Sequence, residues 1–79
     1  MYDRIRHCRE DRDLSQKEMA AILNVAQTTY SDYELGKINI PLAILCKLAL
    51  FHETSIDYLL GLTDSPIPYP RSKIKSKEK

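Results

Sequence analysis

Apolar residues recur at helical spacing along most of the chain, interrupted at regular intervals by residues that end or turn a helix. Between these interruptions the spacing predicts short amphipathic helices rather than strands. The predicted helices cover residues 2–11, 16–23, 27–34, 41–51 and 56–60. After residue 64 the pattern changes, because three prolines alternate with other residues and a polar, basic segment follows, which predicts an extended and disordered tail.

The strongest local signals surround the second and third predicted helices. Ser15 and Glu18 have the spacing of a capping box, in which each side chain satisfies a backbone N–H group of the first helical turn. Asn24 tolerates a left-handed backbone and is expected to turn the chain, while Gly36 is placed to end the next helix. Ala26 occupies the cap position of that helix and has no side-chain acceptor, which typically costs about 1 kcal/mol.

The fourth predicted helix has more apolar residues than one buried face requires. Pro41 is expected at its first position, and Leu42, Leu45, Leu48 and Ala49 are predicted to form its buried face. Ile44, Leu50 and Phe51 are apolar as well, which indicates a second surface to bury. In the last helix, Ser55 is the predicted N-cap, Ile56, Leu59 and Leu60 are expected to face inward, and Gly61 to end it.

The chain resembles the helix-turn-helix family of phage repressors and Cro-like (XRE-type) DNA-binding proteins. The residues that carry the resemblance are Leu14, Gln16, Ala20, Val25, Tyr30, Glu34, Gly36, Leu45, Ala49, Ser55 and Gly61. The resemblance implies an all-α fold, a compact five-helix bundle of the lambda-repressor type. We therefore expect a DNA-binding domain over residues 1–64 and a basic tail over residues 65–79.

In a helix-turn-helix the second helix enters the major groove, and its first residues reach base edges. By helical spacing, Gln27, Thr28, Ser31 and Asp32 share one polar face, and Tyr30, Tyr33 and Glu34 turn toward the bundle. A glutamine suits adenine N6 and N7, a threonine suits a thymine methyl group, and an aspartate accepts from cytosine N4.

Further roles follow from the resemblance alone. It implies phosphate contacts from residues around the two helices and an ion pair between the first and third helices. The expected phosphate-contacting residues are Gln16, Lys17, Lys37 and Asn39, and the expected ion pair joins Arg9 to Glu34. The alternative interpretations are a merely solvated polar helix and two solvated surface charges.

One such domain contacts only a half-site, so specific binding usually requires a two-fold dimer on an inverted repeat of double-stranded DNA. The surplus apolar residues suggest a homodimer interface formed by Ile44, Leu50, Phe51, Tyr58 and Leu62. The leading hypothesis is a sequence-specific transcriptional regulator, and more specifically a repressor. Two alternatives stay open: the antitoxin of a toxin–antitoxin pair, and a protein-interaction module that has kept the fold without binding DNA.

Charge is distributed unevenly along the 79 residues. Residues 65–79 carry five basic groups and one acidic group, a net charge of +4, which leaves −3 for residues 1–64. A DNA-binding surface usually needs a basic footprint, so the acidic body favours the interaction-module alternative somewhat. The tail is either an electrostatic arm for the DNA backbone or a solubilising segment.

The remaining chemistry-bearing residues indicate no enzyme. No nucleophile–base motif, glycine-rich phosphate loop or metal-ligand cluster is present in the sequence, so we expect no catalytic residue, metal or cofactor. Cys8 and Cys46 are predicted to be buried, reduced thiols, His7 to be solvated, and His52 to be a capping or half-buried structural residue. The charged N-terminus and the lack of a long apolar run predict a cytoplasmic protein without a signal peptide or membrane span.

Overall fold

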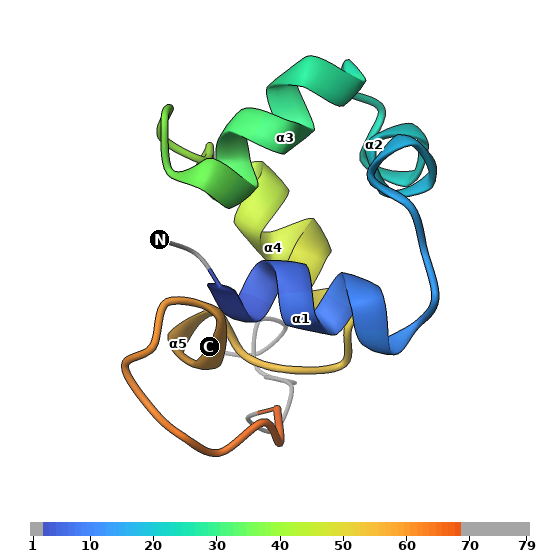
Figure 1. Cartoon of the computed structure of the whole chain (residues 1–79). Coiled ribbons are helices and arrows are strands. Elements are labelled where there is room, and N and C mark those ends of the chain that lie inside the picture. The colour runs from blue at the N-terminus through green and yellow to red at the C-terminus, as the bar shows by residue number, and fades with distance from the viewer. Residues whose placement is uncertain (1–2, 69–79) are drawn as a thin grey trace, which may run out of the picture.

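The computed structural model describes residues 3–68, and these form five α-helices and no strand. The helices are α1 (Asp3–Asp11), α2 (Gln16–Leu23), α3 (Gln27–Leu35), α4 (Leu42–Phe51) and α5 (Ile56–Leu59). Helix α2 packs against α3 and α4, while α1 crosses the bundle and contacts α3 and α5 (Figure 1). This arrangement confirms the predicted all-α, five-helix fold. None of these helices is long and apolar enough to cross a membrane.

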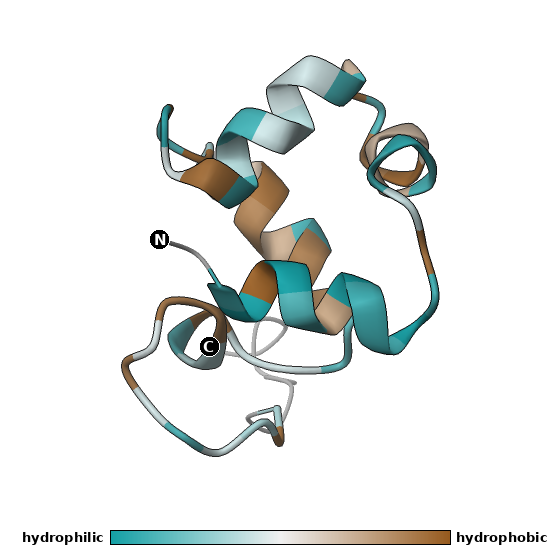
Figure 2. Cartoon of the chain, viewed as in Figure 1, coloured by the Kyte–Doolittle hydropathy of each residue, from teal (hydrophilic) through white to brown (hydrophobic). Residues whose placement is uncertain are grey.

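Every helix contributes to one core. The fully buried side chains are Ile5 from α1, Met19 and Leu23 from α2, Tyr30 from α3, Leu48 from α4 and Leu59 from α5. Figure 2 shows α4 as the most hydrophobic helix, whereas α1 is hydrophilic along most of its length. The core therefore forms where single apolar rows of several helices meet around α4.

The helix ends follow the local chemistry that the sequence predicted. The hydroxyl of Ser15 accepts from the Glu18 N–H at 3.0 Å, and the Ser15 N–H donates to the Glu18 carboxylate at 2.8 Å. Asn24 and Gly36 both adopt the left-handed conformation, with φ of 59° and 73°, and end α2 and α3. Ser55 caps α5 by accepting from the Tyr58 N–H at 3.0 Å.

Several boundaries and burial predictions were wrong. Pro41 is the N-cap of α4 rather than its first helical residue, α3 extends one residue further to Leu35, and α5 ends at Leu59, which leaves Leu60 outside the helix and partly exposed. Leu42 is 70% exposed, although Leu48 and Ala49, further along the predicted face of α4, are buried.

The prediction of two buried thiols was also wrong. Cys8 is only half-buried and Cys46 is exposed, because Cys46 lies on the side of α4 opposite Ile44 and Leu48. Burial in the described structure raises the pKa of the Cys8 thiol, which keeps it protonated at neutral pH. His52, in contrast, is buried at the C-cap of α4, as expected for a structural histidine.

A cluster centred on Arg4 joins the two ends of the described chain. Its guanidinium donates to the carbonyl oxygens of Tyr58, at 3.0 Å, and Thr63, and to the carboxylate of Asp64 at 2.8 Å. The guanidinium also lies over the Tyr58 ring, 4.3 Å from its centroid. We call this set of contacts the Arg4 clasp. Residue 2 and the predicted disordered tail from residue 69 onward lie outside the described residues.

Candidate nucleic-acid interface

Helices α2 and α3 are joined by a three-residue turn, whose path is set by one left-handed residue and a backbone hydrogen bond to α2. The left-handed Asn24 reverses the chain, and the Val25 N–H donates to the Ala20 carbonyl at 3.0 Å. The Val25 side chain packs against the core. The turn therefore sets the direction of α3 relative to α2, which is the geometry of a helix-turn-helix (Figure 1).

Helix α3 has one buried face and one solvent face. Tyr30, Tyr33 and Glu34 are buried, and the two tyrosine rings meet edge to face with centroids 6.5 Å apart. Gln27 and Thr28 are exposed in the first turn, and Ser31 and Asp32 are half-exposed one turn later. These four residues thus occupy the solvent side that the sequence predicted for them.

The buried edge of α3 is held by an ion pair to α1. Arg9 donates through Nε to Glu34 Oε2 at 2.7 Å and through Nη2 to Glu34 Oε1 at 3.2 Å. The side chains are only 11% and 4% exposed, respectively, so this is a buried bidentate pair. Arg9 Nη1 also donates to the Leu14 carbonyl at 2.8 Å, so one guanidinium connects α1, the start of α2 and the end of α3.

This environment sets the charge states. Burial opposes the ionised form of Glu34, but hydrogen bonds from its neighbours, chiefly Arg9, lower its pKa below the usual value. The hydrogen bond to Glu34 raises the pKa of Arg9. Burial and the adjacent Glu34 carboxylate raise the pKa of Tyr30, which keeps its hydroxyl neutral. Glu34 and Arg9 are therefore charged at neutral pH.

Gln16 takes part in the same cluster, which the sequence did not indicate. Its Nε2 donates to Glu34 Oε1 at 3.0 Å, so the side-chain amide is turned toward the protein. The Gln16 side chain is thus engaged within the protein, while its backbone N–H lies at the positive end of α2. The signal that would have revealed the side-chain contact is absent from the sequence, because the partners are 18 positions apart in different helices.

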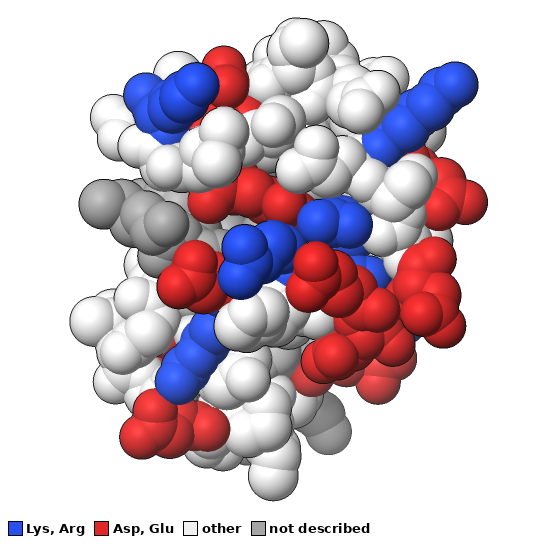
Figure 3. Space-filling view, in the orientation of Figure 1, with Lys and Arg blue, Asp and Glu red and all other residues white. Residues whose placement is uncertain are grey.

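Basic side chains lie beside α3, whereas acidic side chains lie mainly elsewhere on the surface. The surface over α3 is largely uncharged with basic groups at its two edges, whereas acidic side chains gather over the C-terminal end of α1 (Figure 3). Lys17 in α2, and Lys37 and Asn39 after α3, are all exposed. The protein thus offers cations beside α3 although its described part is acidic overall.

The residues predicted for a dimer interface do not all lie on a free surface. Ile44 and Phe51 pack against the core, and Tyr58 is covered by Arg4. Leu50 and Leu62 are exposed, and so are Leu60 and Ile67, which the prediction did not include.

A family model described as helix-turn-helix matches residues 5–59, which is more than two thirds of the chain. The chain belongs to this helix-turn-helix family. The matched region contains the α2–turn–α3 unit, the Arg9–Glu34 pair and all five helices except the first two residues of α1. The resemblance inferred from the sequence is thereby confirmed.

Individual relatives of this helix-turn-helix chain come from bacteria and phages. It is 37% identical over 65 residues to the uncharacterised HTH-type transcriptional regulator YobD of Bacillus subtilis, which covers 82% of the chain. It is 36% identical over 58 residues, 73% of the chain, to the SPbeta prophage-derived regulator YonR of the same organism. It is also 36% identical over 74 residues, 94% of the chain, to the cryptic phage CTXphi transcriptional repressor RstR of Vibrio cholerae.

The matched regions account for 58%, 54% and 64% of the lengths of these three relatives. No solved structure matches the chain significantly.

Proposed function

We propose that this chain is a sequence-specific DNA-binding transcriptional regulator that inserts the first turn of α3 into the major groove. The observation that carries the proposal is the exposed, uncapped and uncharged start of α3, in a helix whose C-terminal end is held by the buried Arg9–Glu34 pair. A recognition helix has to present polar side chains on a rigid support, because a loosely held helix loses the alignment that bidentate base contacts require.

The positions of the exposed side chains indicate which residues contact bases and which contact phosphates. Gln27 and Thr28 are the residues nearest to base edges, and Ser31 and Asp32 contribute one turn further along the groove. Each good bidentate base contact discriminates by about 1–3 kcal/mol. The N–H groups at the start of α2, together with Lys17, Lys37 and Asn39, hold the phosphates on either side.

Repression is the more specific proposal, supported by the name of the Vibrio cholerae phage relative. Two copies bind an inverted repeat whose half-sites are about 34–36 Å apart, since one domain covers only one half-site. The homodimer uses the exposed apolar side chains near the ends of α4 and α5, namely Leu50, Leu60 and Leu62. Such a regulator acts in the cytoplasm, where bacterial and phage DNA is accessible.

The decisive experiment is a selection from a random pool of duplex DNA with the wild-type protein and its Gln27→Ala variant. We expect an inverted repeat to be enriched, with loss of preference at one base position of each half-site in the variant. If no sequence is enriched even at low salt, the DNA-binding proposal is wrong and a protein partner has to be sought.

A matched pair of lysine variants tests the phosphate contacts. Lys37→Ala, beside α3, is expected to reduce the slope of log K against log salt by about 1, because one released counterion is lost. Lys47→Ala removes an equally exposed lysine from α4, outside the proposed interface, and is expected to leave the slope unchanged. Equal slopes for the two variants would contradict the placement of DNA on this side.

A further inference from the structure

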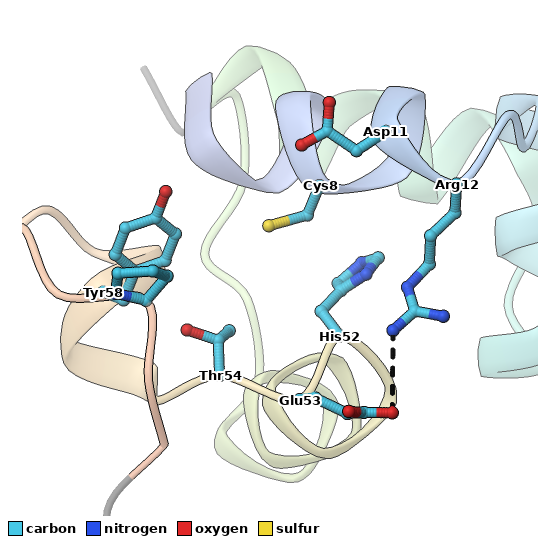
Figure 4. A pocket seen from close by; sticks show the side chains of 8 residues that line it. Cys8, Asp11, Arg12, His52, Glu53, Thr54 and Tyr58 are labelled. Carbon is cyan, nitrogen blue, oxygen red and sulfur yellow. Dashed lines mark ion pairs between the residues drawn. The ribbon is translucent and has the colours of Figure 1, made fainter.

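An open pocket of about 340 Å³ lies between α1 and the α4–α5 connection, and no residue of α3 lines it among those described (Figure 4). Asp11 lines it at the end of α1, and His52, Glu53 and Thr54 line it from the connection. Pro66 also lines the pocket, so the chain leaves the domain along its edge. No step in the proposed recognition of DNA uses this pocket.

Buried polar atoms face the pocket without a partner. His52 is 9% exposed and Thr54 is 3% exposed, and neither ring nitrogen of His52 nor the Thr54 hydroxyl has a hydrogen-bond partner among the described residues. Figure 4 shows the His52 ring directed into the space below α1 and the Thr54 hydroxyl at the floor of the same hollow. Burial and the nearby Arg12 charge lower the pKa of His52 to about 4, so the ring is neutral and one nitrogen accepts hydrogen bonds.

The rim of the pocket carries excess negative charge. Glu10, Asp11 and Asp13 are exposed at the C-terminal end of α1, where the helix dipole already places negative potential. None of the three forms an ion pair within residues 3–68, and acidic groups dominate this part of the surface in Figure 3. Asp11 and Glu53 are the carboxylates that line the pocket itself, and we call these two residues the acidic rim.

The one cation that lines the pocket is already engaged. Arg12 lies 4.0 Å from the Glu53 carboxylate and over the Phe51 ring, 4.9 Å from its centroid. Besides Arg12, the pocket offers carboxylates, which only accept hydrogen bonds, and a neutral imidazole and a hydroxyl, each of which can accept one. Its complement is a cation with several N–H donors, such as an ammonium or a guanidinium group.

We propose that the basic segment of this chain after Pro68 binds the acidic rim and pocket of its own domain. Residues 69–79 contain five basic groups and one acidic group, a net charge of +4, opposite in sign to the rim. Eleven residues span at most about 35–40 Å, and both rim residues line the same pocket as Pro66, so the segment begins close to them. Attachment at this edge also gives the segment an effective concentration in the millimolar range.

Binding there places the positive charge of the segment at a pocket that no described residue of α3 lines. The basic groups of the segment then pair with the carboxylates of the acidic rim and not with DNA phosphates. The proposal does not depend on DNA binding, and its test contains no DNA.

The test compares amide spectra of the full 79-residue chain with those of two tail variants. In the first variant Lys73, Lys75 and Lys77 are replaced by serine, and in the matched control the same three residues are replaced by arginine. At about 10 mM salt, where the screening length is about 30 Å, we expect the serine variant alone to shift the resonances of Asp11, Glu53 and Thr54. At about 1 M salt, where it is about 3 Å, the three spectra should coincide in this region.

A rim variant closes the argument. In a chain carrying Asp11→Asn and Glu53→Gln, replacing the tail lysines by serine is expected to leave the pocket resonances unchanged, while circular dichroism verifies the fold. Unchanged pocket resonances in the serine variant would overturn the proposal, as would shifts that persist at high salt or that fall on α3 instead. Shifts that vanish on dilution would show binding to a second copy and would overturn binding within one domain.

Discussion

The buried Arg9–Glu34 pair permits the sharpest prediction about stability. Arg9→Met keeps much of the aliphatic stem but removes the guanidinium, which takes two hydrogen bonds from Glu34 and one from the Leu14 carbonyl. The Glu34 side chain is 4% exposed, and the Gln16 amide, which remains as a donor to it, carries no charge. Breaking a buried pair in this way costs about 3–5 kcal/mol, a large share of the 5–15 kcal/mol typical of a folded domain.

Replacing both partners measures the interaction energy of the ion pair separately from the other effects of each substitution. In the double variant Arg9→Met/Glu34→Met no buried charge is left alone, so we expect much of the lost stability to return. Urea unfolding of the wild type, the two single variants and the double variant measures the coupling, which we expect to exceed about 2 kcal/mol. Lys47→Met, on an exposed position, controls for the substitution itself.

The pH dependence provides an independent check. In the wild type the pKa of Glu34 is lowered by folding, so its contribution is present above the unfolded value and is lost as pH falls through the folded value. Without Arg9 the buried carboxyl gains stability when it protonates, so the deficit of Arg9→Met should narrow toward pH 4. This account would be refuted if each single variant lost less than about 1 kcal/mol of unfolding free energy, if the two losses added up in the double variant, and if neither depended on pH.

Three further predictions concern single positions. Ala26→Ser should raise the free energy of unfolding by about 1 kcal/mol, since Ala26 already has N-cap geometry without a side-chain acceptor; urea unfolding measures the gain. Gly36→Ala should lower the free energy of unfolding by about 1–2 kcal/mol, because the φ of 73° at this position is unfavourable for a residue with a Cβ atom. Gly36→Asn should lower it less, since asparagine tolerates this left-handed conformation. The free energy of unfolding should fall by roughly 1–3 kcal/mol as pH drops from 6.5 to 4. The reason is that His52 binds a proton near pH 6.5 in the unfolded chain but only near pH 4 in the folded protein. The variant His52→Gln should flatten this pH profile.

The success of the sequence-based predictions depended on the distance between the interacting residues. Helix ends set by neighbours a few positions apart, such as Ser15 with Glu18, were predicted correctly because the controlling contacts are local. The periodicity of α3 likewise placed Tyr30 inside and Gln27 outside.

Contacts between distant residues were predicted poorly. Leu42 fits the apolar row of α4 but is 70% exposed, because burial depends on which other elements lie beside a residue, and no local pattern records that. The Arg9–Glu34 pair was expected only through the family resemblance, and the Arg4 clasp, with partners 54 to 60 positions away, was not expected at all. The base and phosphate contacts stay predictions, because they depend on a partner molecule.

The Arg4 clasp has a consequence for synthesis of the protein. Arg4 is translated almost at once, but its acceptors at Tyr58, Thr63 and Asp64 follow 54 to 60 residues later. At about 5–20 residues per second the nascent helix α1 waits several seconds for the residues that hold it. A chain released before residue 58 therefore lacks all the contacts that fasten α1 at its N-terminal end, and it is expected to be a preferred substrate for cellular proteases.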